Sequence, residues 1–132
     1  MAISNTLNPW APRVLSIVRV VAGLVFLAHG SQKLLGFPAS DMNPPMFSIF
    51  WFAGAIELIG GLLITGGLFT RYAAFIVSGE MAVAYFMSHL PRGFAPIANG
   101  GIVVVAYCFA CLLLVFYGGG IWSLDAQLRK KT

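Results

Sequence analysis

Four ionisable side chains interrupt long apolar runs of this sequence and are its main candidates for chemistry. Arg19 and His29 lie in the first run, Glu57 in the second and Glu80 in the third. A charged group near the centre of a membrane span costs roughly 2.5 to 3.5 kcal/mol, so each one needs a partner or a function. At about 1.5 Å per helical residue, Arg19, Glu80, Glu57 and His29 fall about 9, 13, 18 and 24 Å from the same side of the membrane. The four groups therefore form a ladder across it.

In a purely structural interpretation, an ion pair of Arg19 with Glu80 or Glu57 accounts for these charges, because it would let the helices assemble. One arginine cannot easily neutralise two carboxylates at different depths. The surplus glutamate is then expected to carry a proton or to hydrogen-bond a bound ligand. We assign catalytic roles to His29, Glu57 and Glu80, and a structural ion pair to Arg19 and Glu80.

Two histidines, His29 and His89, end the first and third apolar runs, with Lys33 and Arg92 close behind them. They predict a basic, partly hydrated mouth in which histidine transfers protons or hydrogen-bonds a carbonyl, since it titrates near neutral pH. In the alternative interpretation, each is an interfacial side chain that extends toward water. No carboxylate or thiolate stands near either histidine in the sequence, so no metal site is predicted.

The segment "YCFAC", residues 107–111, places a C-x-x-C pair in the middle of the fourth apolar run. Redox pairs of this kind usually sit at a helix N-terminus, where a thiolate is stabilised. Here no glycine or proline opens the helix, so Cys108 and Cys111 are predicted to be packing residues. Tyr107 can donate a hydrogen bond inside the bundle and is counted among the ligand-binding candidates.

The elements that carry these residues are predicted to be transmembrane helices. Of the 132 residues, 59% are hydrophobic and 9% are charged, whereas a soluble domain has roughly 25% charged residues. Apolar runs long enough to span a bilayer cover Val14 to Leu35, Phe47 to Phe69, Tyr72 to His89 and Ile97 to Tyr117. We predict a single all-α domain over residues 1–132, an antiparallel bundle of four transmembrane helices.

Glycine and proline mark the breaks between these runs. A Pro-rich loop follows residue 35, a tight turn is predicted at Thr70 and Arg71, and three glycines at 118–120 end the last span. After these glycines, residues 122–131 are predicted to form a short amphipathic helix with Ser123 as its N-cap. No cleavage site follows the first run, so a removable signal peptide is not expected.

The distribution of basic residues predicts how the chain is oriented in the membrane. One side of the four spans holds Arg13, Arg71, Arg129, Lys130 and Lys131, and the other holds Lys33 and Arg92. Since basic residues in short loops favour the cytoplasm, both termini are predicted to be cytoplasmic in a bacterial inner membrane. The basic end "LRKK" suits anionic lipid head groups better than nucleic acid.

Several motifs together resemble the DoxX family of small four-helix bacterial membrane proteins. They are "HGSQKLLGF" (29–37), "ELIGGLLITGGLFTRYAA" (57–74), "GE" (79–80), "HLPRGFAPIANGG" (89–101) and "GGGIWSLD" (118–125). The family is similar to subunits of membrane thiosulfate:quinone oxidoreductases, and some members are linked to oxidative-stress and thiol systems. The resemblance implicates His29, Lys33, Glu57, Arg71, Glu80, His89, Asn99 and Asp125. One departure is Ile102, where family members commonly carry an acidic residue after the paired glycines.

Two functions from different classes follow. In the first, the chain is a membrane subunit of a quinone-linked oxidoreductase system, with catalytic His29, Glu57 and Glu80. Its ligand-binding residues are Lys33, His89, Arg92, Asn99 and Tyr107. In the second, the chain is a non-enzymatic scaffold or a small-solute carrier. No redox cofactor site is identified in the chain, so a redox role needs a bound quinone or a partner subunit. The other partners considered are the lipid bilayer and further copies of the chain. The sequence leaves open whether the chain itself is catalytic.

Overall fold

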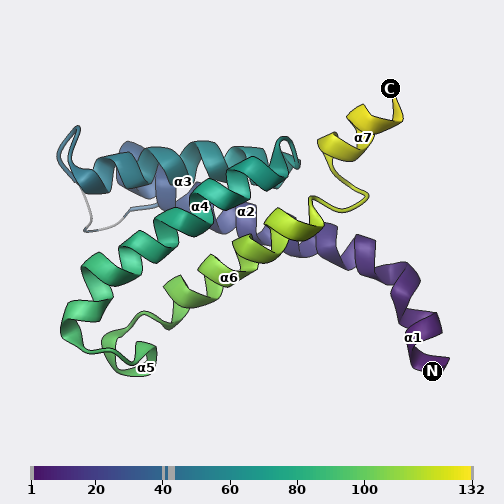
Figure 1. Cartoon of the computed structure of the whole chain (residues 1–132). Helices are drawn as coiled ribbons and strands as arrows, with labels where there is room; N and C mark the ends of the chain where they lie inside the picture. The colour runs from purple at the N-terminus through teal and green to yellow at the C-terminus, as the bar shows by residue number, and fades with distance from the viewer. Residues whose placement is uncertain (1, 40, 42–43, 132) are drawn as a thin grey trace.

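The chain is built from helices in the computed structural model, which describes residues 2–39, 41 and 44–131 (Figure 1). Its long helices are α2 (Ala11–Leu35), α3 (Ile49–Gly66), α4 (Thr70–Ala84) and α6 (Ile102–Tyr117). The short ones are α1 (Ala2–Leu7), α5 (Pro96–Asn99) and α7 (Leu124–Lys130). No strand occurs among these residues, so the predicted all-α class is confirmed. The Pro-rich loop predicted after residue 35 lies partly outside the described residues.

Three helical stretches of the described chain are long and apolar enough to cross a membrane. They are Ala2–Leu35, Ile49–Gly66 and Thr70–Arg92. The fourth candidate, α6, is apolar but has 16 residues, fewer than the sequence predicted. It starts at Ile102 rather than Ile97 because Pro96–Asn99 forms a separate turn of helix that ends at Gly100, whose φ is 76°. A span at α6 therefore stays a prediction.

The connection between α3 and α4 lies three residues earlier than predicted. Thr70 and Arg71 do not form the turn but begin α4, and the turn is made by Gly67 and Phe69, both with left-handed backbone angles. Phe69 occupies the N-cap position of α4 but has no side chain that could accept a hydrogen bond. The carboxylate of Asp125 accepts instead, at 2.8 Å from the Phe69 nitrogen and 3.0 Å from the Thr70 nitrogen. A residue of α7 thus caps α4.

Close helix contacts depend on four glycines, Gly23, Gly30, Gly60 and Gly61. The tightest packing is between α2 and α3 and between α4 and α6 (Figure 1). A Cβ atom on Gly61 would come within 2.5 Å of the Leu27 backbone nitrogen, and added Cβ atoms on Gly23 and Gly30 would likewise overlap α3. Without a hydrophobic drive between helices in lipid, such backbone proximity supplies the packing energy.

Both ends of the chain lie at the same end of the molecule in Figure 1, and α5 lies at the opposite end. The three glycines end α6, and Ser123 caps α7 by accepting from the Ala126 nitrogen at 3.1 Å, as predicted. Arg71 donates to the carbonyls of Val115 and Phe116 at 2.9 and 2.6 Å, which satisfies the end of α6.

Replacing Gly61 by alanine should destabilise the protein, because the added methyl group pushes α3 away from α2. We expect a loss of about 1–3 kcal/mol, typical of an overpacked contact. Thermal unfolding in detergent measures it. The matched control is Gly79→Ala, also inside a helix, where no atom lies within 4 Å of the added Cβ. That change should be neutral or slightly stabilising. Equal losses at both positions would contradict the assignment.

Asp125 should make stability depend on pH. Partial burial opposes ionisation of this carboxyl, but hydrogen bonds from Thr70 and Phe69 outweigh it and hold the pKa of Asp125 below its usual range. The stabilisation is therefore complete above about pH 4, near the unfolded value, and is lost as the pH falls through the lower folded pKa. We expect Asp125→Asn to cost about 1 kcal/mol at neutral pH. In thermal melts, its difference from wild type should shrink below about pH 4, and a constant difference would contradict the cap.

Candidate functional site

A cavity of about 650 Å³ lies between α2, α3, α4 and α6, toward the end of the molecule opposite the two termini. It gathers most of the side chains that the sequence singled out: His29, Lys33, Glu57, Glu80, His89, Arg92 and Tyr107. Two of the predicted site residues, Asn99 and Arg19, do not line it. The remaining wall is apolar, so the polar groups are concentrated in one place. A largely apolar cavity with a few convergent polar groups is typical of a small-molecule site.

The polar centre of the cavity is a cluster of one lysine and two glutamates. The Lys33 Nζ atom lies 2.9 Å from the Glu57 Oε1 atom, and the two side chains are 13% and 3% exposed. Glu80 interacts electrostatically with both of them. Glu80 also forms a side-chain hydrogen bond with Glu57, so the two carboxyl groups make an acid pair. The second oxygens of the two glutamates, Glu57 Oε2 and Glu80 Oε2, are buried, and no other described residue donates to them.

This cluster corrects the predicted ion pair. Glu57, not Glu80, is the paired acid, and its partner is Lys33, not Arg19. Lys33 is also not a water-facing cation of the mouth, because it turns inward from α2 toward α3. Glycine explains the geometry, since Gly54 of α3 sits against the Lys33 Cβ atom and leaves the lysine stem room to pass. Glu80 is then the surplus acid that the sequence required.

Arg19 serves a different purpose near the other end of the molecule. Its guanidinium donates to the carbonyls of Gly119, Trp122 and Thr65, and the residue is 2% exposed. Sequence reasoning missed this because it looked for an anionic partner, whereas backbone carbonyls also accept from the two terminal guanidinium nitrogens and leave only Nε without a partner. The glycines at 118–120 were the sign of this arrangement in the sequence, because they end an apolar helix and leave its last carbonyls in need of partners.

Both histidines of the cavity hydrogen-bond a backbone carbonyl through the same ring nitrogen. His29 Nδ1 lies 2.9 Å from the Val25 carbonyl, and His89 Nδ1 lies 3.2 Å from the Asn99 carbonyl. A carbonyl only accepts, so each Nδ1 carries the proton and each neutral ring keeps an accepting Nε2. His29 was expected to donate to a ligand carbonyl. In its neutral form it accepts instead.

A turn of π-helix, η2 (Tyr85–His89), continues α4 and brings His89 to the cavity wall. Asn99 supports this turn. Its Nδ2 atom donates to the Gly93 carbonyl at 2.7 Å and to the Tyr85 hydroxyl at 3.2 Å, while its Oδ1 atom accepts from Gly101. These bonds use both amide hydrogens of Asn99 and one lone pair of its Oδ1 atom, and Asn99 does not line the cavity, so its ligand-binding role stays a prediction.

The thiols lie beside the cavity and take part in packing. Cys111 is buried in the core, and Ser78 donates to the Cys108 carbonyl at 2.8 Å. Both cysteines are reduced, in agreement with the predicted packing role. Tyr107 lines the cavity and meets Phe26 edge to face with ring centroids 5.2 Å apart.

Apolar side chains with large exposed surfaces surround the polar cluster on α3 and α4. Phe50 and Phe52 of α3 are each 50% exposed, and Ile76 of α4 is 56% exposed. All three line the cavity, and the contact between α3 and α4 is less extensive than that within the two tight helix pairs. Sequence reasoning did not select these residues, because nothing distinguishes them from other lipid-facing side chains. Gly79, beside Glu80, was the only local signal of open space.

The fold and this cavity define an all-helical integral membrane protein with a partly polar internal site. The chain belongs to the DoxX family, whose profile matches residues 14–90. No solved structure matches it.

Three relatives illustrate the range of the family. An uncharacterized protein of Haemophilus influenzae is 42% identical over 96% of this chain and 99% of its own length. An uncharacterized membrane protein of Mycobacterium tuberculosis is 30% identical over the whole chain and 96% of its own length. CatD of Bacillus subtilis, whose name carries a provisional oxidoreductase assignment, is 38% identical over 42% of this chain and 44% of its own length.

Replacing the two glutamates separately should give different results. Glu57→Gln leaves the buried Lys33 ammonium without its closest anion, so we expect a loss of roughly 1.5–3 kcal/mol. Glu80→Gln should retain the fold and most of the stability. Thermal unfolding and size-exclusion profiles in detergent measure both.

A paired change provides the control. If the ion pair is the cause, the double variant Lys33→Met with Glu57→Leu should recover much of the stability lost in Glu57→Gln, because removing both charges leaves no unpaired group. A large loss of stability in Glu80→Gln with none in Glu57→Gln would contradict the assignment.

Proposed function

We propose that this protein is a membrane subunit of a quinone-linked oxidoreductase system and that its cavity binds the quinone in reduced form. One observation supports this most: a buried pair of carboxyl groups, Glu57 and Glu80, carries two oxygens to which no other described residue donates, in a largely apolar cavity of about 650 Å³. A ligand that fits must bring hydrogen-bond donors on an apolar body. A quinol has this chemistry, since its ring is apolar and its two hydroxyl groups donate.

The charges of the cluster support a proton-transfer role. One ammonium faces two carboxyl groups, so electrical neutrality requires one proton on the glutamate pair. Because Glu57 is paired with Lys33, Glu80 is the group that can exchange this proton with a ligand. His29 Nε2 supplies a second acceptor nearer the loop end of the bundle. Oxidation of a bound quinol releases two electrons, which would pass to the partner subunit, and two protons. His29 Nε2 would accept one proton, and Glu80 would accept the other after it has released its resting proton toward the outer surface.

The exposed apolar residues on α3 and α4 support a ligand that comes from the bilayer. A lipid-soluble molecule can cross this rim, whereas a polar solute would have to lose its water first. This favours the quinone over the alternative of a carrier for a small polar solute. The sequence predicted that Lys33 makes the mouth of the cavity positive. Because Lys33 turns inward, we assign this role to Arg92, which is exposed at the cavity rim.

The proposal includes the setting of the site. The four long helices act as an antiparallel bundle of four spans in the bacterial inner membrane, with both termini cytoplasmic and the cavity toward the outer surface. Among the described residues no group of three metal-ligating side chains occurs. Electrons are proposed to pass to a partner subunit that carries its own cofactor. In this scheme the chain binds and orients the quinol and moves its protons.

Binding of a short-chain quinol to the purified protein in detergent tests the proposal. We expect His29→Ala to weaken quinol binding roughly tenfold, because it removes an acceptor. Glu80→Gln should weaken it at least as much, because it places an amide NH2 donor where a carboxyl oxygen could accept from the quinol. Asp125→Asn is the matched control: it also neutralises an acid, but far from the cavity, and it should leave binding unchanged. Arg92→Gln should mainly reduce the salt dependence.

Two results would overturn the proposal. One is the absence of binding by both the quinol and the quinone in wild type, while the cluster residues still determine stability. That outcome would favour the scaffold interpretation. The other is full quinol binding in both His29→Ala and Glu80→Gln, which would place the ligand elsewhere.

A further inference from the structure

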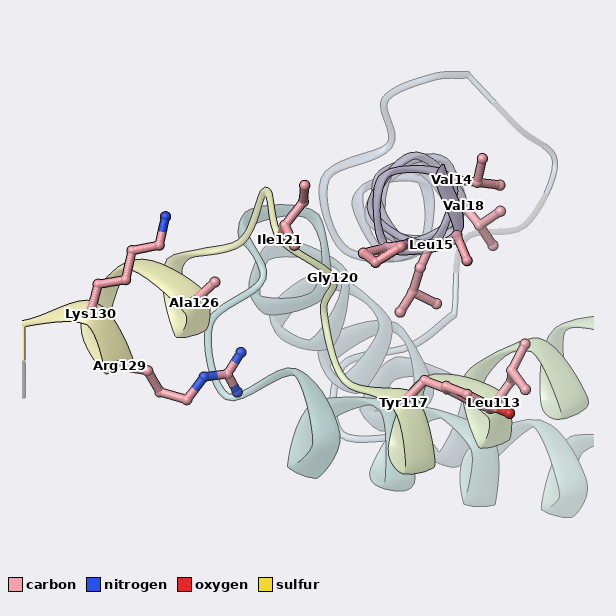
Figure 2. A pocket seen from close by; sticks show the side chains of 12 residues that line it. Val14, Leu15, Val18, Leu113, Tyr117, Gly120, Ile121, Ala126, Arg129 and Lys130 are labelled. Atoms are coloured by element: carbon pink, nitrogen blue, oxygen red, sulfur yellow. The ribbon is translucent and has the colours of Figure 1, made fainter. Parts of the chain in front are cut away.

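A second cavity, of about 900 Å³, lies at the opposite end of the molecule and takes no part in the proposed redox site. Its walls come from the first turns of α2, the end of α6, the glycine segment and α7. Figure 2 shows two distinct regions. Val14, Leu15, Val18, Leu113 and Tyr117 stand on one side, and Arg129 and Lys130 project from α7 on the other. We call this cavity the α7 groove.

The apolar region of the α7 groove belongs to the membrane. Val14 and Val18 are 52% and 43% exposed, and both lie in the first helical stretch that is long enough to span a bilayer. The basic region lies beyond the end of α6, where a helix of seven residues, α7, runs from Leu124 to Lys130. The groove therefore crosses from apolar to cationic surroundings within one cavity.

No acidic side chain lines the α7 groove among the residues that the structure describes. The one acid of α7, Asp125, accepts from the backbone of Phe69 and Thr70 with its two oxygens and also interacts electrostatically with Arg129. Lys130 lines the groove as well, and Lys131 adds a further positive charge beside it. The three cations outnumber the one acid, so the net charge around the groove is positive and favours an anionic occupant.

We propose that the α7 groove binds one anionic phospholipid. Its phosphate lies against Arg129 and Lys130, and one acyl chain lies on the apolar wall of α2 and α6. Charge complementarity selects the head group, and the apolar wall requires a chain, so a free phosphate would satisfy only half of the site. A lipid in this position bridges α2 and α7, which contact the same groove from opposite ends of the sequence. It would strengthen the attachment of α7 at no cost to the quinol site.

Native mass spectrometry of the detergent-solubilised full chain tests this. Phosphatidylglycerol and phosphatidylcholine with identical acyl chains are titrated separately. We expect one phosphatidylglycerol per protein, bound roughly tenfold or more tightly than phosphatidylcholine. This preference should weaken as the ionic strength rises.

Three variants locate the site. The double variant Arg129→Gln with Lys130→Gln should lose the preference for phosphatidylglycerol. Val18→Trp should fill the apolar end and weaken both lipids. Lys131→Gln is the matched control: it removes one cation of the same terminal segment outside the groove lining, and it should keep the preference largely intact. Thermal melts in phosphatidylcholine confirm that each variant is folded.

Four outcomes would overturn the proposal. The first is equal affinity of wild type for the two lipids. The second is an undiminished preference in the double variant. The third is a loss in Lys131→Gln as large as in the double variant, which would indicate general attraction to the basic terminus. The last is a lipid-free dimer that Val18→Trp dissociates, since a second copy of the chain would then occupy the groove.

Discussion

The burial of one guanidinium among backbone carbonyls holds the structure together. Inside a bilayer every backbone polar group needs a partner within the protein, because lipid offers none. The glycines after α6 break the helix and free their carbonyls, and Arg19 satisfies Gly119, Trp122 and Thr65 at once. Ser16 reinforces the same segment by accepting from the Trp122 nitrogen at 3.0 Å. The first helix thereby fixes the last segment, which in turn carries Asp125 to the start of α4.

This use of Arg19 determines the chemistry at the other end. Because the guanidinium is occupied by carbonyls, Lys33 becomes the counter-ion of Glu57, and Glu80 remains without a cation of its own. The molecule thus separates its charges into a structural group near the termini and a reactive group near α5. Loss of Glu80 alone leaves the first group intact.

The two cavities face the bilayer differently. The one around Glu80 has apolar residues at its rim and polar groups inside, which suits a lipid-soluble ligand that carries donors. The α7 groove has its cations at the end farther from the apolar helices and an apolar wall toward the membrane. This arrangement suits a lipid that stays anchored in its leaflet. Both cavities have largely apolar walls, and the sign of the charges and their position relative to the apolar surface are what differ.

The sequence by itself determined the helical class, the three long spans and most of the polar residues of the cavity, because these follow from hydropathy and from the cost of buried charge. It also required one surplus acid. Only the tertiary structure decided which acid that is, since pairing depends on how α2 and α3 are rotated against each other. It likewise assigned Arg19 to carbonyls and Asn99 to a turn. A side chain's partner in space cannot be read from its spacing along one helix, because the partner belongs to another.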